Sequence, residues 1–253
     1  MSRPTPDVVV EPDAEHLARA AAAALVARLA AAQAVHGSAA VVLTGGGIGV
    51  AVLEQVAALA AQPVRETIDW EHVDVWWGDD RFVPADDDER NEKQARKALL
   101  SRVGVPDHHI HAMPPSDGDF ADPEDAAAWY ADQLAAAAPD GEDVPRLDLL
   151  MLGMGPEGHV ASIFPHSPAI EDARTVVTVR NCPKPPPIRI SLGFPAINAA
   201  QEVWLLVSGD AKAPAVAQAL SGADVAQLPA AGVHGTRATR WLLDRAAAAV
   251  HLA

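Results

Sequence analysis

The sequence has very little cysteine, few aromatic residues and fewer basic than acidic side chains. A single cysteine, Cys182, among 253 residues excludes an intrachain disulfide. This is typical of a reducing compartment, so we expect a cytoplasmic protein. The formal net charge of −15 argues against nucleic acid and anionic membranes as partners. A small anionic substrate is compatible with this charge if basic side chains gather in one place.

Long hydrophobic runs are also missing. No apolar run approaches the roughly 20 residues that a membrane-spanning helix requires. The first twenty residues lack the basic segment followed by an apolar one that marks a secretory signal. The sequence therefore predicts a soluble protein, and its length is sufficient to bury a sizeable core. We expect one domain over residues 1–253, working as a monomer.

What the chain does contain is short apolar runs that alternate with alanine-rich helical segments. This alternation favours an α/β fold in which helices cover both faces of a mostly parallel sheet, a three-layer sandwich. Strands are expected at 40–43, 73–77, 147–152, 175–179, 188–192, 203–207 and 239–243. Helices are expected from Glu11-Pro12 to the residue before Gly37, and at 49–61, 91–103, 123–137 and 211–220.

The segment Thr44-Gly45-Gly46-Gly47 connects an expected strand to an expected helix. Exposed N–H groups in such a loop, together with the positive end of the helix dipole, form a site for phosphate or another anion. The G-x-G-x-x-G spacing of dinucleotide-binding loops is not met. The alternative interpretation is a tight strand-to-helix turn without a ligand.

Two charged residues, Asp79 and Arg81, follow the expected strand 73–77. The carboxyl edge of an open α/β sheet is where ligands bind. There Arg81 is able to stabilise an anionic oxygen, and Asp79 to orient a partner. The alternative is a structural ion pair.

A glycine-rich loop containing Gly155 and Gly158 follows the expected strand 147–152 and ends at His159. Imidazole exchanges a proton near neutral pH, so His159 at a strand end is a candidate catalytic base.

The proline-rich loop from Lys184 to Arg189 holds two cations ahead of another expected strand. In so acidic a chain, these two cations are candidate phosphate ligands. Solvated loop charges are the alternative.

Taken in order, these segments resemble the 6-phosphogluconolactonase family. The resemblance rests on Thr44-Gly45-Gly46-Gly47, Trp77 to Pro84, Gly153 to His159 and Lys184 to Leu192, and extends to Trp241-Leu242-Leu243-Asp244. It implies a Rossmann-like α/β sandwich that hydrolyses 6-phospho-D-glucono-1,5-lactone to 6-phosphogluconate in the oxidative pentose phosphate pathway, without metal or organic cofactor. Members usually carry serine at the position of Gly47, glutamate at Asp80 and aspartate at Glu157, and serine is frequent at Arg90.

The resemblance suggests a role for each candidate residue. Neutral His159 would take a proton from the attacking water and return it to the leaving ring oxygen. Arg81 would stabilise the oxyanion, and Asp79 would hold either His159 or a sugar hydroxyl. The predicted substrate-binding residues are Thr44, Gly45, Gly46, Gly47, Gly155, Gly158, Lys184 and Arg189.

Two other functions stay open at this stage. A glucosamine-6-phosphate deaminase has a similar loop and histidine, but in that family Asn-Glu-Pro follows, whereas Ala161 to His166 here contains no carboxylate. A sugar-phosphate sensor without catalysis would need the phosphate loop but neither Arg81 nor His159.

Overall fold

The computed structural model describes residues 5–62 and 68–252. The predicted single domain over 1–253 includes residues outside these ranges, and its extent stays a prediction. Within the described residues, a six-stranded sheet forms the centre of the fold, in the order β1-β9-β8-β5-β2-β3. All its pairings are parallel. Its strands are β1 (Asp7–Glu11), β2 (Ala39–Leu43), β3 (Val73–Trp77), β5 (Leu149–Gly153), β8 (Glu202–Val207) and β9 (Ala238–Asp244).

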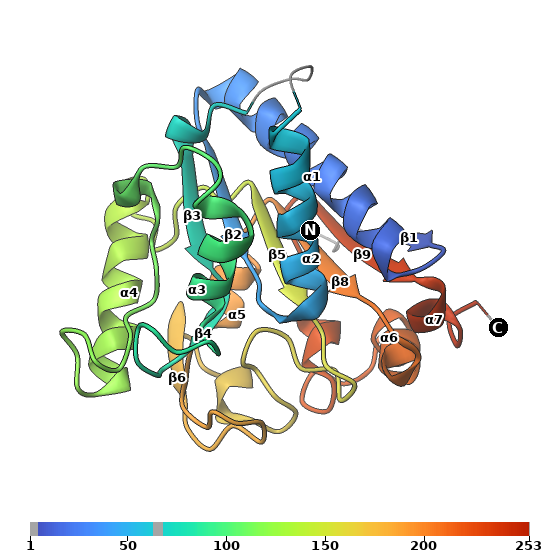
Figure 1. Ribbon diagram of the computed structural model, residues 1–253. Helices are drawn as coiled ribbons and strands as arrows, with labels where there is room; N and C mark the ends of the chain where they lie inside the picture. The colour runs from blue at the N-terminus through green and yellow to red at the C-terminus, as the bar shows by residue number, and fades with distance from the viewer. Residues whose placement is uncertain (1–4, 63–67, 253) are drawn as a thin grey trace.

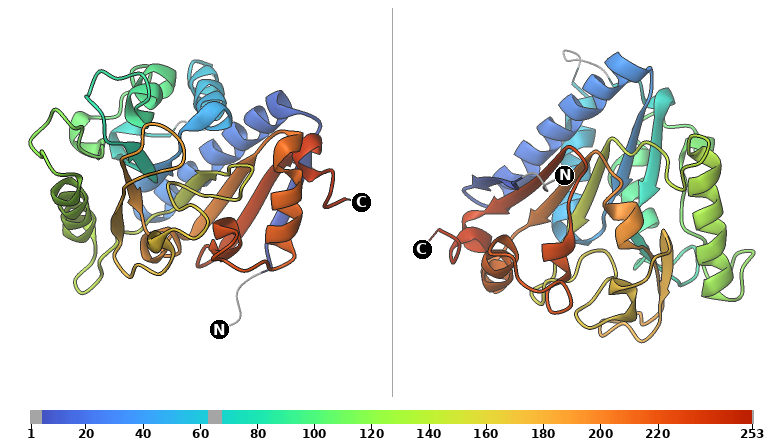
Figure 2. Two further views of the ribbon diagram at one scale, coloured as in Figure 1. Left: turned by 90° about the horizontal axis from the view of Figure 1, so that it is seen from below. Right: turned by 180° about the vertical axis from the view of Figure 1, so that it is seen from behind.

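Helices cover both faces of this sheet, with α1 and α2 on one face, α5 on the other and α4 beside the β3 edge (Figures 1 and 2). This confirms the predicted α/β class. The helices are α1 (Ala14–His36), α2 (Gly46–Ala60), α3 (Asn91–Ala95), α4 (Pro123–Ala137), α5 (Phe194–Ile197), α6 (Ala213–Leu220) and α7 (Arg245–Ala248).

The first helix begins later than predicted. Residues Asp7–Glu11 form the edge strand β1, and Asp13 caps α1 by accepting a hydrogen bond from the backbone N of His16 at 2.9 Å. The helix ends at Gly37, whose φ of 77° suits glycine. By length and composition α1 could cross a membrane. In the fold, however, Leu17, Leu25 and Leu29 lie on a buried stripe, as in a core helix.

A second, three-stranded antiparallel sheet has the order β4-β7-β6. Its strands are β4 (Asp79–Arg81), β6 (Val176–Val179) and β7 (Arg189–Leu192). Two of the predicted strands therefore lie outside the main sheet. Gly78 links the two sheets, because its N–H donates to Leu43 and its carbonyl accepts from Leu192. The expected helix 91–103 is shorter than predicted and continues from α3 as a π-helical turn, Arg96–Leu100.

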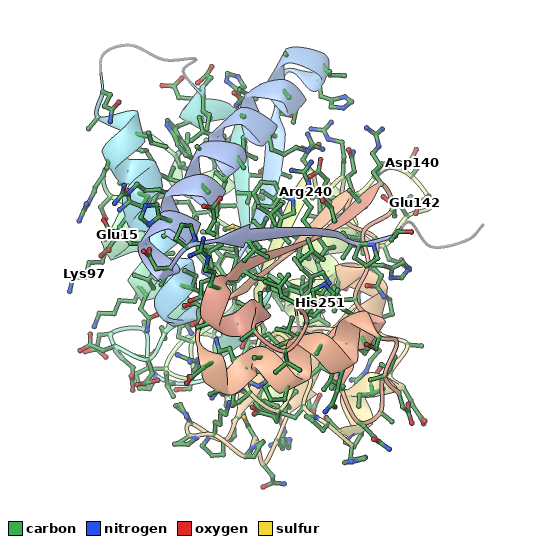
Figure 3. All side chains as sticks on the ribbon, turned by 90° about the vertical axis from the view of Figure 1, so that its right-hand side faces the viewer. Glu15, Lys97, Asp140, Glu142, Arg240 and His251 are labelled. Atoms are coloured by element: carbon green, nitrogen blue, oxygen red, sulfur yellow. The ribbon has the colours of Figure 1, made fainter. Side chains whose placement is uncertain are left out.

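The core is made by the apolar runs that predicted the strands. Trp76, Trp77 and Trp204 are fully buried in it. Charged side chains such as Glu15 and Lys97 lie at the surface (Figure 3). Because the strands are parallel, the loops after β2, β5 and β8 all meet at the carboxyl edge, beside the small sheet.

Candidate active site

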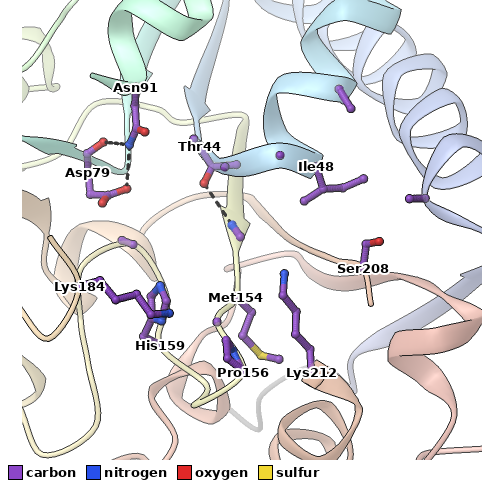
Figure 4. A pocket seen from close by; sticks show the side chains of 18 of the residues that line it. Thr44, Ile48, Asp79, Asn91, Met154, Pro156, His159, Lys184, Ser208 and Lys212 are labelled. Atoms are coloured by element: carbon purple, nitrogen blue, oxygen red, sulfur yellow. Dashed lines mark hydrogen bonds between the residues drawn. The ribbon is translucent and has the colours of Figure 1, made fainter. Parts of the chain in front are cut away.

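A cavity of about 800 Å³ lies at this carboxyl edge, within the size range of small-molecule sites. All four predicted segments line it, although they are far apart in the sequence (Figure 4). The predicted site residues on its wall are Thr44, Gly45, Gly46, Gly47, Asp79, Arg81, Gly155, His159, Lys184 and Arg189.

The start of α2 forms one end of the cavity. Its N-cap residue, Gly45, has no side chain to satisfy the first backbone N–H groups, and the first turn carries no acidic residue. Gly46 has a φ of 80°, and a Cβ at Gly47 would meet open space. Since uncapped helix N–H groups bind anions, this end suits a phosphate. The side chain of Thr44 has a structural role. Its Oγ1 accepts a hydrogen bond from the N–H of Gly153 at 3.1 Å, and this bond connects the ends of β2 and β5.

Lys212, which the sequence analysis missed, reaches into the cavity from the opposite side, toward the start of α2 (Figure 4). Burial lowers its pKa, and the charge of Lys184 acts in the same direction. A cation held in a partly desolvated position is stabilised by a bound anion. Lys212 lies in the segment that follows β8. A basic residue shortly after a parallel strand was therefore the sequence signal that could have identified Lys212 as a site residue.

The imidazole of His159 lies at the other end of the cavity. Its Nδ1 atom is 3.0 Å from Oε1 of Glu157, and its ring stacks on Phe164 with centroids 4.3 Å apart. A carboxylate only accepts hydrogen bonds, so Nδ1 carries the proton of the neutral ring and Nε2 carries the lone pair. Burial lowers the pKa of His159, and the Lys184 charge adds to this effect. The ring is therefore neutral at physiological pH, as a general base requires.

Glu157 is a second residue that the sequence analysis missed as a site residue. Lys184 Nζ lies 2.8 Å from its Oε1 and 3.2 Å from its Oε2. Burial acts to raise the pKa of Glu157, but the hydrogen bond from Lys184, a backbone hydrogen bond and the charges of His159 and Lys184 together keep the pKa below its ordinary value. Lys184 thus lies beside the base on the wall of the cavity, and its predicted contact with the phosphate stays a prediction.

Two glycines of the histidine loop are required for different reasons. A Cβ at Gly155 would overlap the His159 ring and would lie 2.6 Å from the Glu157 carboxylate. Gly158 has a φ of 81° and packs against Leu228. It is not among the residues lining the cavity, so its predicted contact with substrate is replaced by a role in the turn.

Asp79 is buried and belongs to a different network from His159. Its Oδ2 accepts a hydrogen bond from Ser162 Oγ at 2.7 Å, and Asn91 Nδ2 donates to its backbone carbonyl at 2.8 Å. The prediction that Asp79 holds His159 is wrong, because Glu157 is the carboxylate at Nδ1 of the imidazole. Asp79 lines the cavity, so the other alternative, a hydrogen bond to a sugar hydroxyl, stays a prediction.

The two arginines of the small sheet are neighbours across β4 and β7. Arg81 lines the cavity, and its Nη1 donates to the backbone carbonyl of Glu89. Arg189 is 5% exposed, and it donates to the carbonyls of Lys184, Pro185 and Pro186. These bonds show that Arg189 stabilises the proline-rich loop, and since it also lines the cavity, its role as a phosphate ligand stays a prediction.

An anion site and a neutral imidazole, placed where parallel strands end, define a Rossmann-like α/β protein with an enzyme-type cavity for a small anionic molecule. Comparison with known proteins narrows this class. The chain belongs to the family of glucosamine-6-phosphate isomerases and 6-phosphogluconolactonases, whose family model matches residues 12–241.

Relatives match over nearly the whole chain. A 6-phosphogluconolactonase of Mycobacterium tuberculosis is 53% identical over 244 residues, which cover 96% of this chain and 97% of that protein. One from Streptomyces coelicolor is 54% identical over 248 residues, covering 96% and 94%. The solved structure of 6-phosphogluconolactonase from Trypanosoma brucei is 28% identical, with a TM-score of 0.81 over 100% of both chains.

Proposed function

We propose that the protein hydrolyses 6-phospho-D-glucono-1,5-lactone to 6-phosphogluconate. The single observation that carries the proposal is that one cavity holds an uncapped helix start, a lysine facing it and a neutral imidazole. The relatives named 6-phosphogluconolactonase support the same substrate.

The phosphate binds at the start of α2, between the N–H groups of residues 45–47 and Lys212. This contact is remote from the reacting carbon, so its binding energy serves to orient the lactone ring. The ring then extends across the cavity toward His159, with Asp79 as the acceptor for a sugar hydroxyl.

The chemistry needs no nucleophilic side chain. The oxygen of water bonds to the lactone carbonyl carbon while its proton passes to Nε2 of His159, and the carbonyl oxygen becomes an oxyanion next to Arg81. The bond from this carbon to the ring oxygen then breaks, and the proton on Nε2 passes to that oxygen. The new carboxylic acid ionises, so each turnover releases one proton to solvent.

The few catalytic groups in the cavity are sufficient because the substrate is already reactive. A six-membered lactone is an ester held in its less stable geometry, and water opens it at a useful rate without an enzyme. Acid-base catalysis that contributes roughly 10²–10⁴-fold is therefore a sufficient task for His159.

The direct test is a turnover assay at constant pH with freshly generated 6-phosphogluconolactone, corrected for spontaneous opening. We expect acid release far above the uncatalysed rate, and none of the ammonia from glucosamine 6-phosphate that a deaminase would produce. Ammonia release, or product binding without lactone turnover, would favour the deaminase or the sensor instead.

Cytoplasmic location and the monomeric state belong to the same proposal. The protein would act on a soluble phosphosugar lactone, without nucleic acid or membrane as a partner. The net charge of −15 supports the absence of nucleic acid and membrane partners from this proposal.

A further inference from the structure

Two oppositely charged side chains, Asp80 and Arg90, are buried next to Arg81. They are 1% and 2% exposed, and Nη2 of Arg90 lies 3.3 Å from Oδ2 of Asp80. Neither residue lines the cavity. Burying two charges is costly unless hydrogen bonds satisfy them, and such pairs can serve to specify one local conformation.

Asp80 binds three backbone N–H groups. Its Oδ1 accepts from Arg81 at 2.8 Å and from Asn91 at 2.7 Å, and its Oδ2 accepts from Glu92 at 3.2 Å. The α3 N-cap residue, Arg90, makes no side-chain cap of its own, so Asp80 caps this helix from β4. Burial raises the pKa of Asp80 to about 6, and the carboxyl is ionised at neutral pH.

Arg90 binds backbone carbonyls of two other segments. Its Nη2 donates to Met113 at 2.7 Å, and its Nη1 donates to the carbonyl of Arg81 at 3.4 Å. In the opposite direction, Nη1 of Arg81 donates to the carbonyl of Glu89, the residue before Arg90. The chain at Arg81 and the chain at residues 89–90 therefore hold each other in both directions.

This double link reaches further into the site through Asn91. The backbone N–H of Asn91 donates to the Asp80 carboxylate, and the side chain of Asn91 donates to the carbonyl of Asp79. Its carboxamide oxygen lies so close to Gly45 that any Cβ there would overlap it. The buried pair is thus connected both to Asp79 and to the start of the anion site.

We propose that Asp80 and Arg90 are positioning residues that hold the guanidinium of Arg81 at the reacting carbonyl. The inference rests on the role proposed above for Arg81. Neither residue touches substrate; they act through the backbone of β4 and through the Glu89 carbonyl. Since a misplacement of about 1 Å costs up to roughly 100-fold in rate, loss of the pair lowers kcat more than it changes KM.

A double-mutant cycle between Arg90 and Arg81 tests this. We expect Arg90→Met to lower kcat for the lactone about 10- to 100-fold in the native background. In an Arg81→Ala background the same substitution causes little further loss, because the group that it positions is already absent. Arg90→Lys keeps the positive charge and restores part of kcat.

Arg146→Met is the matched control. Arg146 pairs with another buried carboxylate, Asp148, at 3.2 Å, but it precedes β5 and so lies at the amino edge of the sheet, away from the cavity. We expect its loss to lower the melting temperature and leave kcat unchanged. Arg90→Met is expected to lower kcat even at temperatures where the variant is fully folded.

The outcomes separate the two proposals. An equal fold-loss of kcat from Arg90→Met in both backgrounds, or an unchanged kcat in the native background, overturns the positioning role alone. Full activity of Arg81→Ala overturns the proposed role of Arg81 and the positioning role with it. If Arg90→Met does not yield folded protein, Arg90→Gln, which also removes the charge, takes its place in the same cycle and is judged by the same outcomes.

Discussion

Glu157 and His159 form a hydrogen-bonded pair, with Oε1 of the carboxylate 3.0 Å from Nδ1 of the imidazole. The same oxygen lies 2.8 Å from Nζ of Lys184. One carboxylate thus fixes the tautomer of the base and also holds the cation whose charge, together with burial, lowers the pKa of the base. The pH dependence of the reaction is therefore set by three side chains, and each can be tested separately.

Replacing Glu157 by Gln removes a negative charge beside the imidazole. The charge-assisted hydrogen bond is worth about 1.5–3 kcal/mol, so kcat should fall roughly 10- to 100-fold as the ring loses its fixed orientation. The Glu157 charge also raises the pKa of His159, so the acid limb of the kcat profile should move to lower pH. A pH series of initial rates measures both effects. Glu142→Gln, at an exposed carboxylate, is the control, and equal rates for the two variants would contradict the pairing.

Replacing Lys184 by Met should move the same acid limb in the opposite direction. The Lys184 charge lowers the pKa of His159, and without it the ring holds its proton up to a higher pH. Because the neutral ring is the active form, more alkaline solution is then needed for full activity. Lys97→Met, an exposed lysine, should leave the profile in place. An acid limb that stays fixed in Lys184→Met would show that this cation does not tune the base.

Replacing Lys212 by Met tests the phosphate end of the cavity. Losing a charged hydrogen-bond donor should lower kcat/KM for the phosphorylated lactone roughly 10- to 100-fold. Hydrolysis of unphosphorylated glucono-1,5-lactone should not change, since that substrate has no group to bind there. Steady-state rates on both lactones give the comparison. Equal losses on both would place Lys212 in the chemistry and not in phosphate binding.

Gly155 and Gly47 should respond differently to a side chain. A Cβ at position 155 overlaps the His159 ring, so Gly155→Ala should lower kcat strongly and leave KM nearly unchanged. Position 47 has open space, and Gly47→Ser adds a hydroxyl near the anion site. A single neutral hydrogen bond should lower KM for the phosphorylated lactone by roughly 2- to 10-fold. Full activity of Gly155→Ala would contradict the observed packing around the base.

The sequence was sufficient to predict the strands that consist of continuous apolar runs, since these are buried on both faces. It failed at β1 and β4. The first has only three valines, and the second consists of charged residues 79–81, whose strand conformation comes from pairing with the distant β7. Tertiary pairing of this kind leaves no local periodicity to detect.

The sequence predicted the location of the candidate site, because the topology of the sheet determines which loops lie together. Loops after parallel strands meet at one edge, so His159 and Arg81 were expected to share a cavity. Side-chain partners depend on rotamers and on packing between distant segments. The sequence therefore did not show that Glu157 pairs with His159 in place of Asp79, or that the donors of Arg189 bind the carbonyls of its own loop.

The rate of lactone hydrolysis by His159→Asn is the most direct test of the central claim, that this imidazole removes the proton from water. Acid release at constant pH should fall roughly 10²–10⁴-fold, and the remaining rate should lose its dependence on an ionisation near the histidine pKa. His166→Asn, the same substitution at an exposed histidine seven residues later, should keep the native rate. Undiminished hydrolysis by folded His159→Asn, with its acid limb intact, would contradict the account.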